Sequence, residues 1–418
     1  MNFALTRSGL VSEVRTSAAP AAARPAGPGH ILDIARVEDP AEIASEWREL
    51  HASQPSSPFQ GTGWASAWCT HVADRPGHRP AIVTGRDSAG LLQMVLPLAL
   101  RRYGPLRVAS WIGTGHGSHI TGLFSSELLA RLDPASAEAL RRDILAVLPG
   151  ADCLALYDQP AMIGNRINPL VNGFSRPAVD NVQMLSLEAG GSEPLTATPN
   201  GRMRRNIRRR YRRLGELGKV RYDVPDGTGS RIALFDELCA QKTGSLERRG
   251  IRSFLNNPGY REFYRALLDA RPADGAAGHI CGMRLNGELI AASLGLIHDR
   301  VYHGLILSTT DDKKIRPCAP GHLLVDQLVT GLSAAGVAGF SLGAGLSEFK
   351  RRWCNREVEL MDTLMPVTAA GHLAVRALAT HRALKRRLKQ SPRASAWFAI
   401  VRAQAGRARM RRSNRAVH

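Results

Sequence analysis

Alternating hydrophobic and polar residues between positions 279 and 308 predict three consecutive β-strands that pair antiparallel. The expected strands are His279–Leu285, Leu289–Ile297 and Val301–Ser308. Asn286-Gly287, between the first two, is the dipeptide typical of a two-residue type I′ hairpin turn. An apolar helical run over residues 322–335 then ends at Gly336, a common residue after a helix, and a short strand follows at Gly339–Leu342. The pattern predicts a strand meander, a crossover helix and a further strand.

The first half of the chain also alternates between strand and helix patterns. Strands are expected at Arg79–Gly85, Leu91–Leu100, Arg107–Ile112 and Cys153–Tyr157, and helices at about 41–51 and 126–148. Residues 162–199 are rich in Pro, Gly and Asn, with one strand expected at Val182–Leu187, and are typical of a connector. We therefore expect an α/β protein of two lobes, at residues 30–190 and 195–366, with mixed, mainly antiparallel sheets flanked by helices. Residues 1–29 are expected to be a disordered leader, and 367–418 a basic tail.

The net charge of +20 is concentrated in two segments. Residues 202–221 contain ten Lys and Arg and one acid, and residues 363–418 contain thirteen Lys and Arg and no acid. The first segment lies in a helix expected over residues 199–217, whose one apolar stripe comprises Met203, Ile207, Tyr211, Leu214 and Leu217. Because the rest of the chain is nearly neutral, the basic character belongs to one helix and one tail.

Cysteine usage and hydropathy limit the protein class. The six cysteines are scattered singly, with no Cys-x-x-Cys or Cys/His spacing, so neither a disulfide framework nor a metal site is expected. His116 and His119 share a glycine-rich loop, but two histidines without a third ligand are more often ordinary loop residues. Residues 1–29 lack the apolar core of a secretory signal. We expect a cytoplasmic protein.

Four motifs in the second half carry a family resemblance. They are Leu285-Asn286-Gly287-Glu288-Leu289-Ile290-Ala291-Ala292, Val301-Tyr302-His303-Gly304, Ala319-Pro320-Gly321-His322-Leu323-Leu324, and Phe340-Ser341-Leu342-Gly343-Ala344-Gly345 continuing to Glu348-Phe349-Lys350. Together they resemble the acyl-CoA-binding half of a GNAT acyltransferase. More narrowly, they are similar to the CelD/BcsL-like branch (BioF2-like acetyltransferase domain) associated with cellulose and exopolysaccharide production. Ser341 stands where that family usually has Asp, and Phe349 where it has Tyr.

The resemblance implies two tandem GNAT-like lobes and an enzyme that moves an acyl group from acyl-CoA, with acetyl-CoA as co-substrate, to an amine or hydroxyl. The expected donor-binding residues are Arg316, Pro320, Gly321, His322 and Leu323, because a helix start offers free N–H groups and a positive dipole end to phosphates. The expected catalytic residues are Tyr302, Glu348 and Lys350. Lys242, His303 and Ser341 are expected to contact substrate. The simpler interpretation of Tyr302 is packing in the core. The simpler interpretation of Lys242 and Glu348 is that they are exposed to solvent.

Three alternatives remain open. One is a tRNA-dependent aminoacyltransferase on the same fold, and another is a non-catalytic accessory protein of a membrane polysaccharide synthase. A nucleic-acid-binding protein is the third, disfavoured because only Tyr211 is interleaved with the arginines of residues 202–221. The tail carries a helical apolar stripe (Leu373, Ala377, Leu384 and Leu388) and an apolar run at Trp397–Val401. Such a tail suits peripheral contact with an anionic inner-membrane surface.

Overall fold

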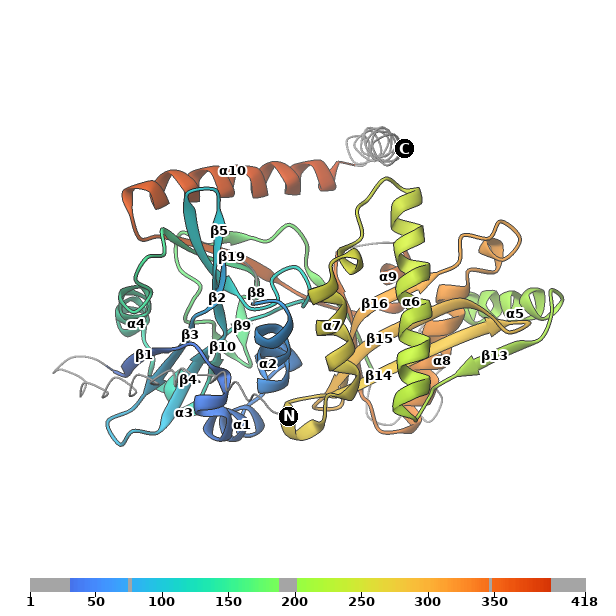
Figure 1. Ribbon diagram of the computed structural model, residues 1–418, viewed down its shortest axis with the longest axis horizontal. Helices are drawn as coiled ribbons and strands as arrows, with labels where there is room; N and C mark the ends of the chain where they lie inside the picture. The colour runs from blue at the N-terminus through green and yellow to red at the C-terminus, as the bar shows by residue number, and fades with distance from the viewer. Residues whose placement is uncertain (1–30, 74–76, 188–200, 346–347, 392–418) are drawn as a thin grey trace, which may run out of the picture.

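The computed structural model describes residues 31–73, 77–187, 201–345 and 348–391, and arranges them as two α/β lobes side by side (Figure 1). The first lobe contains the strands β1 (Asp33–Val37), β2 (His78–Pro80), β3 (Ile82–Arg86), β4 (Leu92–Leu96), β5 (Leu98–Tyr103), β6 (Leu106–Trp111), β7 (Leu123–Phe124), β8 (Cys153–Pro160), β9 (Met162–Ile163), β10 (Arg166–Ile167), β11 (Arg176–Pro177) and β19 (Leu360–Pro366). Its helices are η1 (Pro40–Ile43), α1 (Ala44–Ser53), η2 (Pro58–Gln60), α2 (Thr62–His71), α3 (Ser126–Arg131), α4 (Pro134–Ala146) and α10 (Ala369–Gln390).

The second lobe is built on one sheet with helices on both faces. Its strands are β12 (Val182–Ser186), β13 (Val220–Asp223), β14 (Ala277–Leu285), β15 (Glu288–His298), β16 (Val301–Thr309), β17 (Gly339–Ala344) and β18 (Arg356–Val358). Its helices are α5 (Gly201–Gly215), α6 (Thr228–Arg248), η4 (Phe254–Asn256), α7 (Pro258–Ala266), η5 (Leu267–Asp269), η6 (Pro272–Asp274), η7 (Arg316–Cys318), α8 (Pro320–Ala334) and α9 (Glu348–Trp353). The expected two-lobed α/β class is confirmed.

Proline divides two elements that the pattern predicted as single. The expected strand over residues 91–100 is broken at Pro97 into β4 and β5, which lie in different sheets. Proline has no N–H for a sheet ladder, so the chain changes sheet there. The expected helix over residues 126–148 is likewise two helices, because Asp133 accepts a hydrogen bond from the Ser136 N–H and Pro134 begins a new helix.

The predicted meander is confirmed and continues into a mixed sheet with strand order β13-β14-β15-β16-β17-β12-β18. Asn286 and Gly287 have φ angles of 52° and 88°, as a type I′ turn requires. The β16–α8–β17 crossover joins two parallel strands. Helix α8 covers one face of this sheet, and α6 contacts β14, β15 and β16.

The two lobes exchange strands, so chain order does not follow sheet membership. Strand β12 precedes the second lobe in sequence but pairs with β17 and β18. Strand β19, from the other end of the chain, pairs with β8 and β11 in the first lobe. A hydrophobic core also crosses the lobe boundary, where the rings of Trp64 and Phe263 lie 4.8 Å apart. The lobes are therefore joined by both backbone and core.

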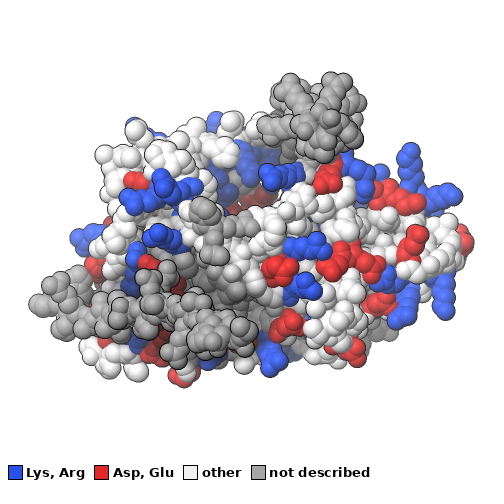
Figure 2. All heavy atoms as spheres, viewed as in Figure 1, with Lys and Arg blue, Asp and Glu red and all other residues white. Residues whose placement is uncertain are grey.

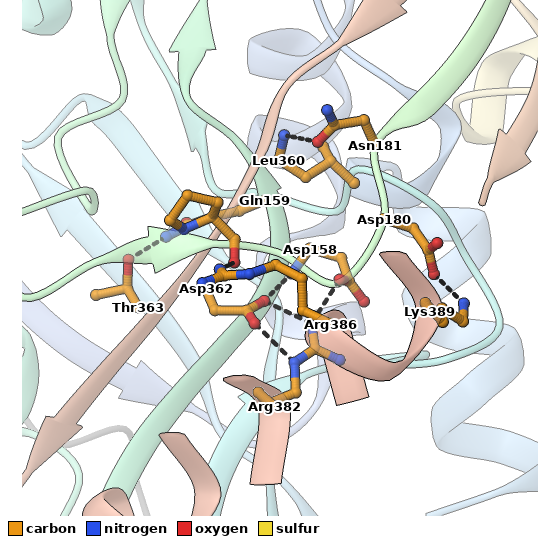
Figure 3. A network of polar contacts seen from close by, with 11 residues as sticks. Asp158, Gln159, Asp180, Asn181, Leu360, Asp362, Thr363, Arg382, Arg386 and Lys389 are labelled. Atoms are coloured by element: carbon orange, nitrogen blue, oxygen red, sulfur yellow. Dashed lines mark hydrogen bonds and ion pairs between the residues drawn. The ribbon is translucent and has the colours of Figure 1, made fainter. Parts of the chain in front are cut away.

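The start of the basic tail is a helix packed on the first lobe. Figure 2 shows Lys and Arg side chains along the upper edge of the molecule, near α10. The predicted stripe does not face the protein: Leu373 and Leu384 are 71% and 55% exposed, whereas Ala374 and Leu378 pack on the first-lobe sheet. The helix is held by Arg382, which pairs with Asp158 and Asp362 at 2.7 and 2.6 Å (Figure 3). These ion pairs, which hydropathy does not report, set the helix orientation.

Two further expectations concern regions outside this description. The leader at residues 1–29 and the run Trp397–Val401 both lie outside the described residues. Among the helices that are described, none combines the length and hydropathy needed to span a membrane.

Candidate functional site

Strands β16 and β17 separate after a short parallel contact. They pair only over Val301–His303 and Gly339–Ser341, and β16 then continues to Thr309. The pairing of β16 with β15 also shifts at this point. Gly304 and Ile306 oppose the consecutive β15 residues Gly295 and Leu294, so Leu305 has no opposing residue. A bulge of this kind increases strand twist and bending. The β16–β17 ladder therefore ends at His303 and Ser341, and the parting of the two parallel strands beyond that point is called the splay below.

Lys242 reaches the splay from α6. Its ammonium nitrogen donates a hydrogen bond to the Leu307 carbonyl oxygen at 2.7 Å, on the part of β16 that has separated from β17. Burial, and secondarily the nearby guanidinium of Arg249, lower the pKa of Lys242. The structure thus brings Lys242 to the same opening as the predicted donor-binding loop, rather than leaving it on the surface.

Lys350 lies at the end of β17. Its ammonium group donates to the carbonyl oxygens of Gly343 and Ala344 at 2.9 and 2.7 Å. Gly343 and Gly345 have φ angles of 78° and 94°, which turn the chain back so that α9 places this lysine against the strand it follows. Burial lowers the pKa of Lys350 to about 8, so its charge changes near neutral pH. Glu348 begins the same helix, and its side chain is outside the described part of the structure.

The start of α8 closes the outer end of the splay. Gly321 is buried, and a Cβ there would lie 3.0 Å from the Thr309 methyl carbon at the end of β16. Pro320 occupies the first turn, and Arg316 lies exposed on η7 just before it. The helix start therefore offers backbone N–H groups and a positive dipole end beside the open strand.

Two predicted donor-binding side chains are engaged elsewhere. The Leu323 side chain is fully buried in the core, and its carbonyl accepts a 3.0 Å hydrogen bond from the Tyr211 hydroxyl. The His322 ring accepts a 3.0 Å hydrogen bond from the Trp353 indole at Nδ1 and contacts Phe349. Leu323 is thus a core residue, and His322 couples α8 to α9.

Two arginines of α5, Arg210 and Arg213, lie near the same helix start, which sequence reasoning missed. The predicted apolar stripe of α5 packs on α8, with Ile207 and Leu214 buried, although Leu217 is 40% exposed. Burial raises the pKa of the Cys318 thiol, just before α8, and the guanidiniums of Arg213 and Arg210 oppose that rise. Burial and the neighbouring guanidiniums of Arg352 and Arg209 lower the pKa of Arg210. Clustered like charges of this kind create a potential that favours a bound anion.

Tyr302 does not face the splay, contrary to its expected role as an acid. Its ring is fully buried, and its hydroxyl lies 2.9 Å from the Ser293 hydroxyl on β15. A Cβ at Gly295 would lie 2.5 Å from that hydroxyl, so the ring lies over β15, on the side away from β17. Burial raises the pKa of Tyr302. Gly295, which lies diagonally across the β15–β16 pair from Tyr302, provides the space for this packing.

His303 and Ser341 are paired neighbours where the splay begins. They are 4% and 0% exposed, and within the described residues neither His303 Nδ1 nor the Ser341 hydroxyl has a hydrogen-bond partner. The His303 ring lies 5.6 Å from Phe59 and 5.4 Å from His119, so it faces the first lobe. Burial, then His119, hold the pKa of His303 well below its usual value. The site therefore includes a neutral imidazole and first-lobe residues that sequence reasoning did not join to it.

The other candidate histidine belongs to the lobe interface. His116 stacks on Tyr260, with ring centroids 3.9 Å apart, and its Nδ1 lies 2.9 Å from the Tyr264 hydroxyl. Burial lowers the pKa of His116 to about 4. These contacts assign His116 to packing between the lobes.

Comparisons with known proteins agree with this fold. Residues 201–351 match the family model described as an acetyltransferase (GNAT) domain, and no curated protein matches the sequence. FemX is similar in fold, with a TM-score of 0.51 and 14% identity over 76% of this chain and 95% of that one. The C-terminal domain of an Agrobacterium fabrum protein named as a lysylphosphatidylglycerol synthetase has a TM-score of 0.50 and 13% identity, over 81% and 96% of the chains. The chain therefore carries a GNAT-type acetyltransferase domain at residues 201–351, within a fold of two α/β lobes that exchange strands.

Proposed function

We propose that this protein transfers an acyl group from an acyl-CoA, with acetyl-CoA as the simplest donor, to an amine or hydroxyl acceptor. The observation that carries the proposal is the splay between β16 and β17, which leads to a helix start with Arg210 and Arg213 nearby. An extended amide-containing chain can hydrogen-bond to an open strand edge, and phosphates suit a cationic helix N-terminus. Acyl-CoA combines both features in one molecule.

The donor phosphates would lie at the start of α8, near Gly321, Arg316 and Arg210. The pantetheine amides would lie along residues 304–309 of β16. This orientation directs the thioester toward His303 and Ser341, where the strands begin to separate. Holding the two reactants in this geometry supplies much of the rate in such a transfer.

The reaction forms a C–N or C–O bond to the acceptor and breaks the C–S bond of the thioester. The acceptor must lose a proton, and the departing thiolate must gain one. A neutral imidazole at His303 is suited to take the first proton, because its free nitrogen can accept it. Lys350, with a pKa of about 8, is suited to give the second as an ammonium group. Glu348 remains a predicted contributor from the resemblance.

The acceptor class rests on the sequence motifs alone. Their similarity to the CelD/BcsL-like branch supports an acceptor in cellulose, exopolysaccharide or envelope production. The basic tail supports peripheral association with an anionic inner-membrane surface, where a polysaccharide synthase is a suitable partner. Envelope polysaccharides and the inner-membrane surface are therefore where the proposed acceptor should be sought.

An aminoacyl-tRNA donor is the second candidate, and α5 is the observation that favours it. Five arginines of this helix (Arg205, Arg208, Arg209, Arg212 and Arg213) are exposed, and the helix contacts α8 and η7. A thermal-shift panel with acetyl-CoA, free CoA and aminoacyl-tRNA separates the two donors. Stabilisation by acetyl-CoA that survives 0.5 M salt, about three times the physiological ionic strength, supports acyl-CoA. A shift with aminoacyl-tRNA alone, lost in Arg208→Gln/Arg212→Gln, favours the second candidate instead.

A further inference from the structure

A second concave site lies in the first lobe and shares no residue with the splay. Its volume is about 790 Å³, within the range of small-molecule sites. Its walls come from α4, the segment 172–177, β19 and α10. Figure 1 shows α10 lying along the edge of this lobe, and Figure 3 shows the ion pairs of Arg382 and Lys389 that hold the helix there. The site exists only because α10 is docked.

The walls carry more positive than negative charge. Six arginines line the cavity, namely Arg141, Arg142, Arg176, Arg376, Arg382 and Arg386, against the two acids Glu138 and Asp362. Two arginines are already paired, Arg141 with Glu138 at 2.5 Å and Arg382 with Asp362 at 2.6 Å. No ion pair is found for the other four within the described residues, and Arg176 and Arg386 donate only to backbone carbonyls. An anionic group in the cavity would therefore meet uncompensated guanidiniums.

The remaining lining is apolar. Leu145 of α4, Leu364 and Met365 of β19, and Val375 and Ala379 of α10 lie side by side around the cavity. Phe174, at the same cavity, is 79% exposed. An inorganic anion would leave this surface without a partner, and a purely apolar ligand would leave the arginines unpaired. The lining fits a ligand with one anionic end and one apolar end.

We propose that this cavity binds an anionic amphiphile, a phosphate head joined to an acyl chain. The phosphate pairs with Arg142 and Arg376, and the chain lies along Leu145, Leu364 and Val375. Arg142 and Arg376 are the suitable pair because both are exposed and lie on two different helices that line the cavity, α4 and α10. This binding site is independent of the transfer reaction proposed above.

The proposal is tested by calorimetric titration of the full-length protein with soluble dihexanoyl phosphatidic acid. Dihexanoyl phosphatidylcholine and inorganic phosphate are the comparison ligands. Saturable binding of phosphatidic acid, tighter than either comparison, is expected. Arg142→Gln/Arg376→Gln should weaken it by roughly tenfold or more, the scale of one hydrogen bond to a charged group. Ala379→Trp should weaken it by filling the cavity, whereas Lys385→Gln, an exposed cation of α10 outside the lining, should not.

A second experiment, with vesicles of phosphatidylglycerol or phosphatidylcholine, distinguishes a bilayer lipid from a free amphiphile as the ligand. Sensitivity of phosphatidylglycerol vesicle binding to the double variant indicates a bilayer lipid, and sensitivity confined to the soluble ligand indicates a free amphiphile. Either result supports the site. The proposal is overturned if neither form binds, if phosphatidylcholine or inorganic phosphate binds as well as phosphatidic acid, or if the folded double variant binds unchanged.

Discussion

The ammonium nitrogen of Lys242 lies 2.7 Å from the carbonyl oxygen of Leu307, so a side chain of α6 supplies a hydrogen bond where β16 has separated from β17. This contact places a partly buried cation on the open strand edge that the proposed function assigns to the acyl donor. Burial lowers the pKa of the same lysine, so this amine is held in the splay at a cost in solvation.

Replacing Lys242 should therefore weaken donor binding. Lys242→Met keeps most of the side-chain volume but leaves the Leu307 carbonyl without its donor. We expect the Kd for acetyl-CoA to rise roughly tenfold, the scale of one hydrogen bond from a charged group. Arg248→Met is the matched control on the same helix, because Arg248 pairs with Asp311 at the surface. Equal Kd values for both variants and the wild type, with normal melting temperatures, would count against the placement of Lys242.

Lys350 should determine the alkaline limb of the pH–rate profile. Its pKa of about 8 means that the ammonium form, which can protonate the thiolate, is lost as pH rises through that value. We expect kcat to fall above pH 8. Lys350→Arg should remove that limb and also lower kcat, because the guanidinium stays charged and does not give up a proton to the thiolate. Lys350→Ala should reduce kcat by roughly 10²-fold.

The control for Lys350 is its exposed neighbour in α9, Arg351. Arg351→Gln should leave both kcat and the shape of the profile unchanged. An alkaline limb that persists in Lys350→Arg would assign the titration to another group.

Tyr302 should be important for stability rather than catalysis. Tyr302→Phe leaves the buried Ser293 hydroxyl without its partner, which costs about 1–2 kcal/mol of unfolding free energy. Urea denaturation should show this loss, and Ser293→Ala should show a loss that is not additive with it. We expect kcat of Tyr302→Phe to stay within about twofold of wild type. A 10²-fold loss of kcat without a loss of stability would restore the role expected from the sequence.

The sequence predicted features that depend on neighbouring residues. Asn286-Gly287 requires positive φ at both positions, and Gly336 ends α8, so the meander and the crossover helix could be located from the pattern. The exchange of β12 and β19 could not, because sheet order depends on contacts between residues far apart in sequence.

The candidate site was predictable only in part, because it too depends on contacts between residues far apart in sequence. Alternation along β16 places Tyr302 and His303 on opposite faces, but it does not identify which face the lobes enclose. The packing of Tyr302 over Gly295 and the approach of α5 to Cys318 are both tertiary contacts. They decide which predicted residues reach the splay.

Arg382 should be a major stabilising residue of the first lobe. It pairs with Asp362, whose side chain is 5% exposed, so Arg382→Met leaves a buried carboxylate without its cation. We expect a loss of about 3 kcal/mol in the free energy of unfolding, measured by urea denaturation. Lys385→Met, an exposed cation on the same helix, should cost less than about 0.5 kcal/mol. Similar losses in the two variants would contradict the anchoring role given to Arg382.

The central claim, that the β16–β17 splay and the α8 start hold an acyl-CoA, is tested most directly by calorimetric titration of acetyl-CoA into two glutamate variants of α8. Gly321→Glu places a carboxylate at the helix start, whereas Gly331→Glu places the same group near the other end, where a Cβ meets no atom within 4 Å. Both variants should show a cooperative melting transition. The account predicts saturable binding to the wild type and to Gly331→Glu, and none to a folded Gly321→Glu. Unchanged binding in Gly321→Glu, or no binding to the wild type, would contradict it.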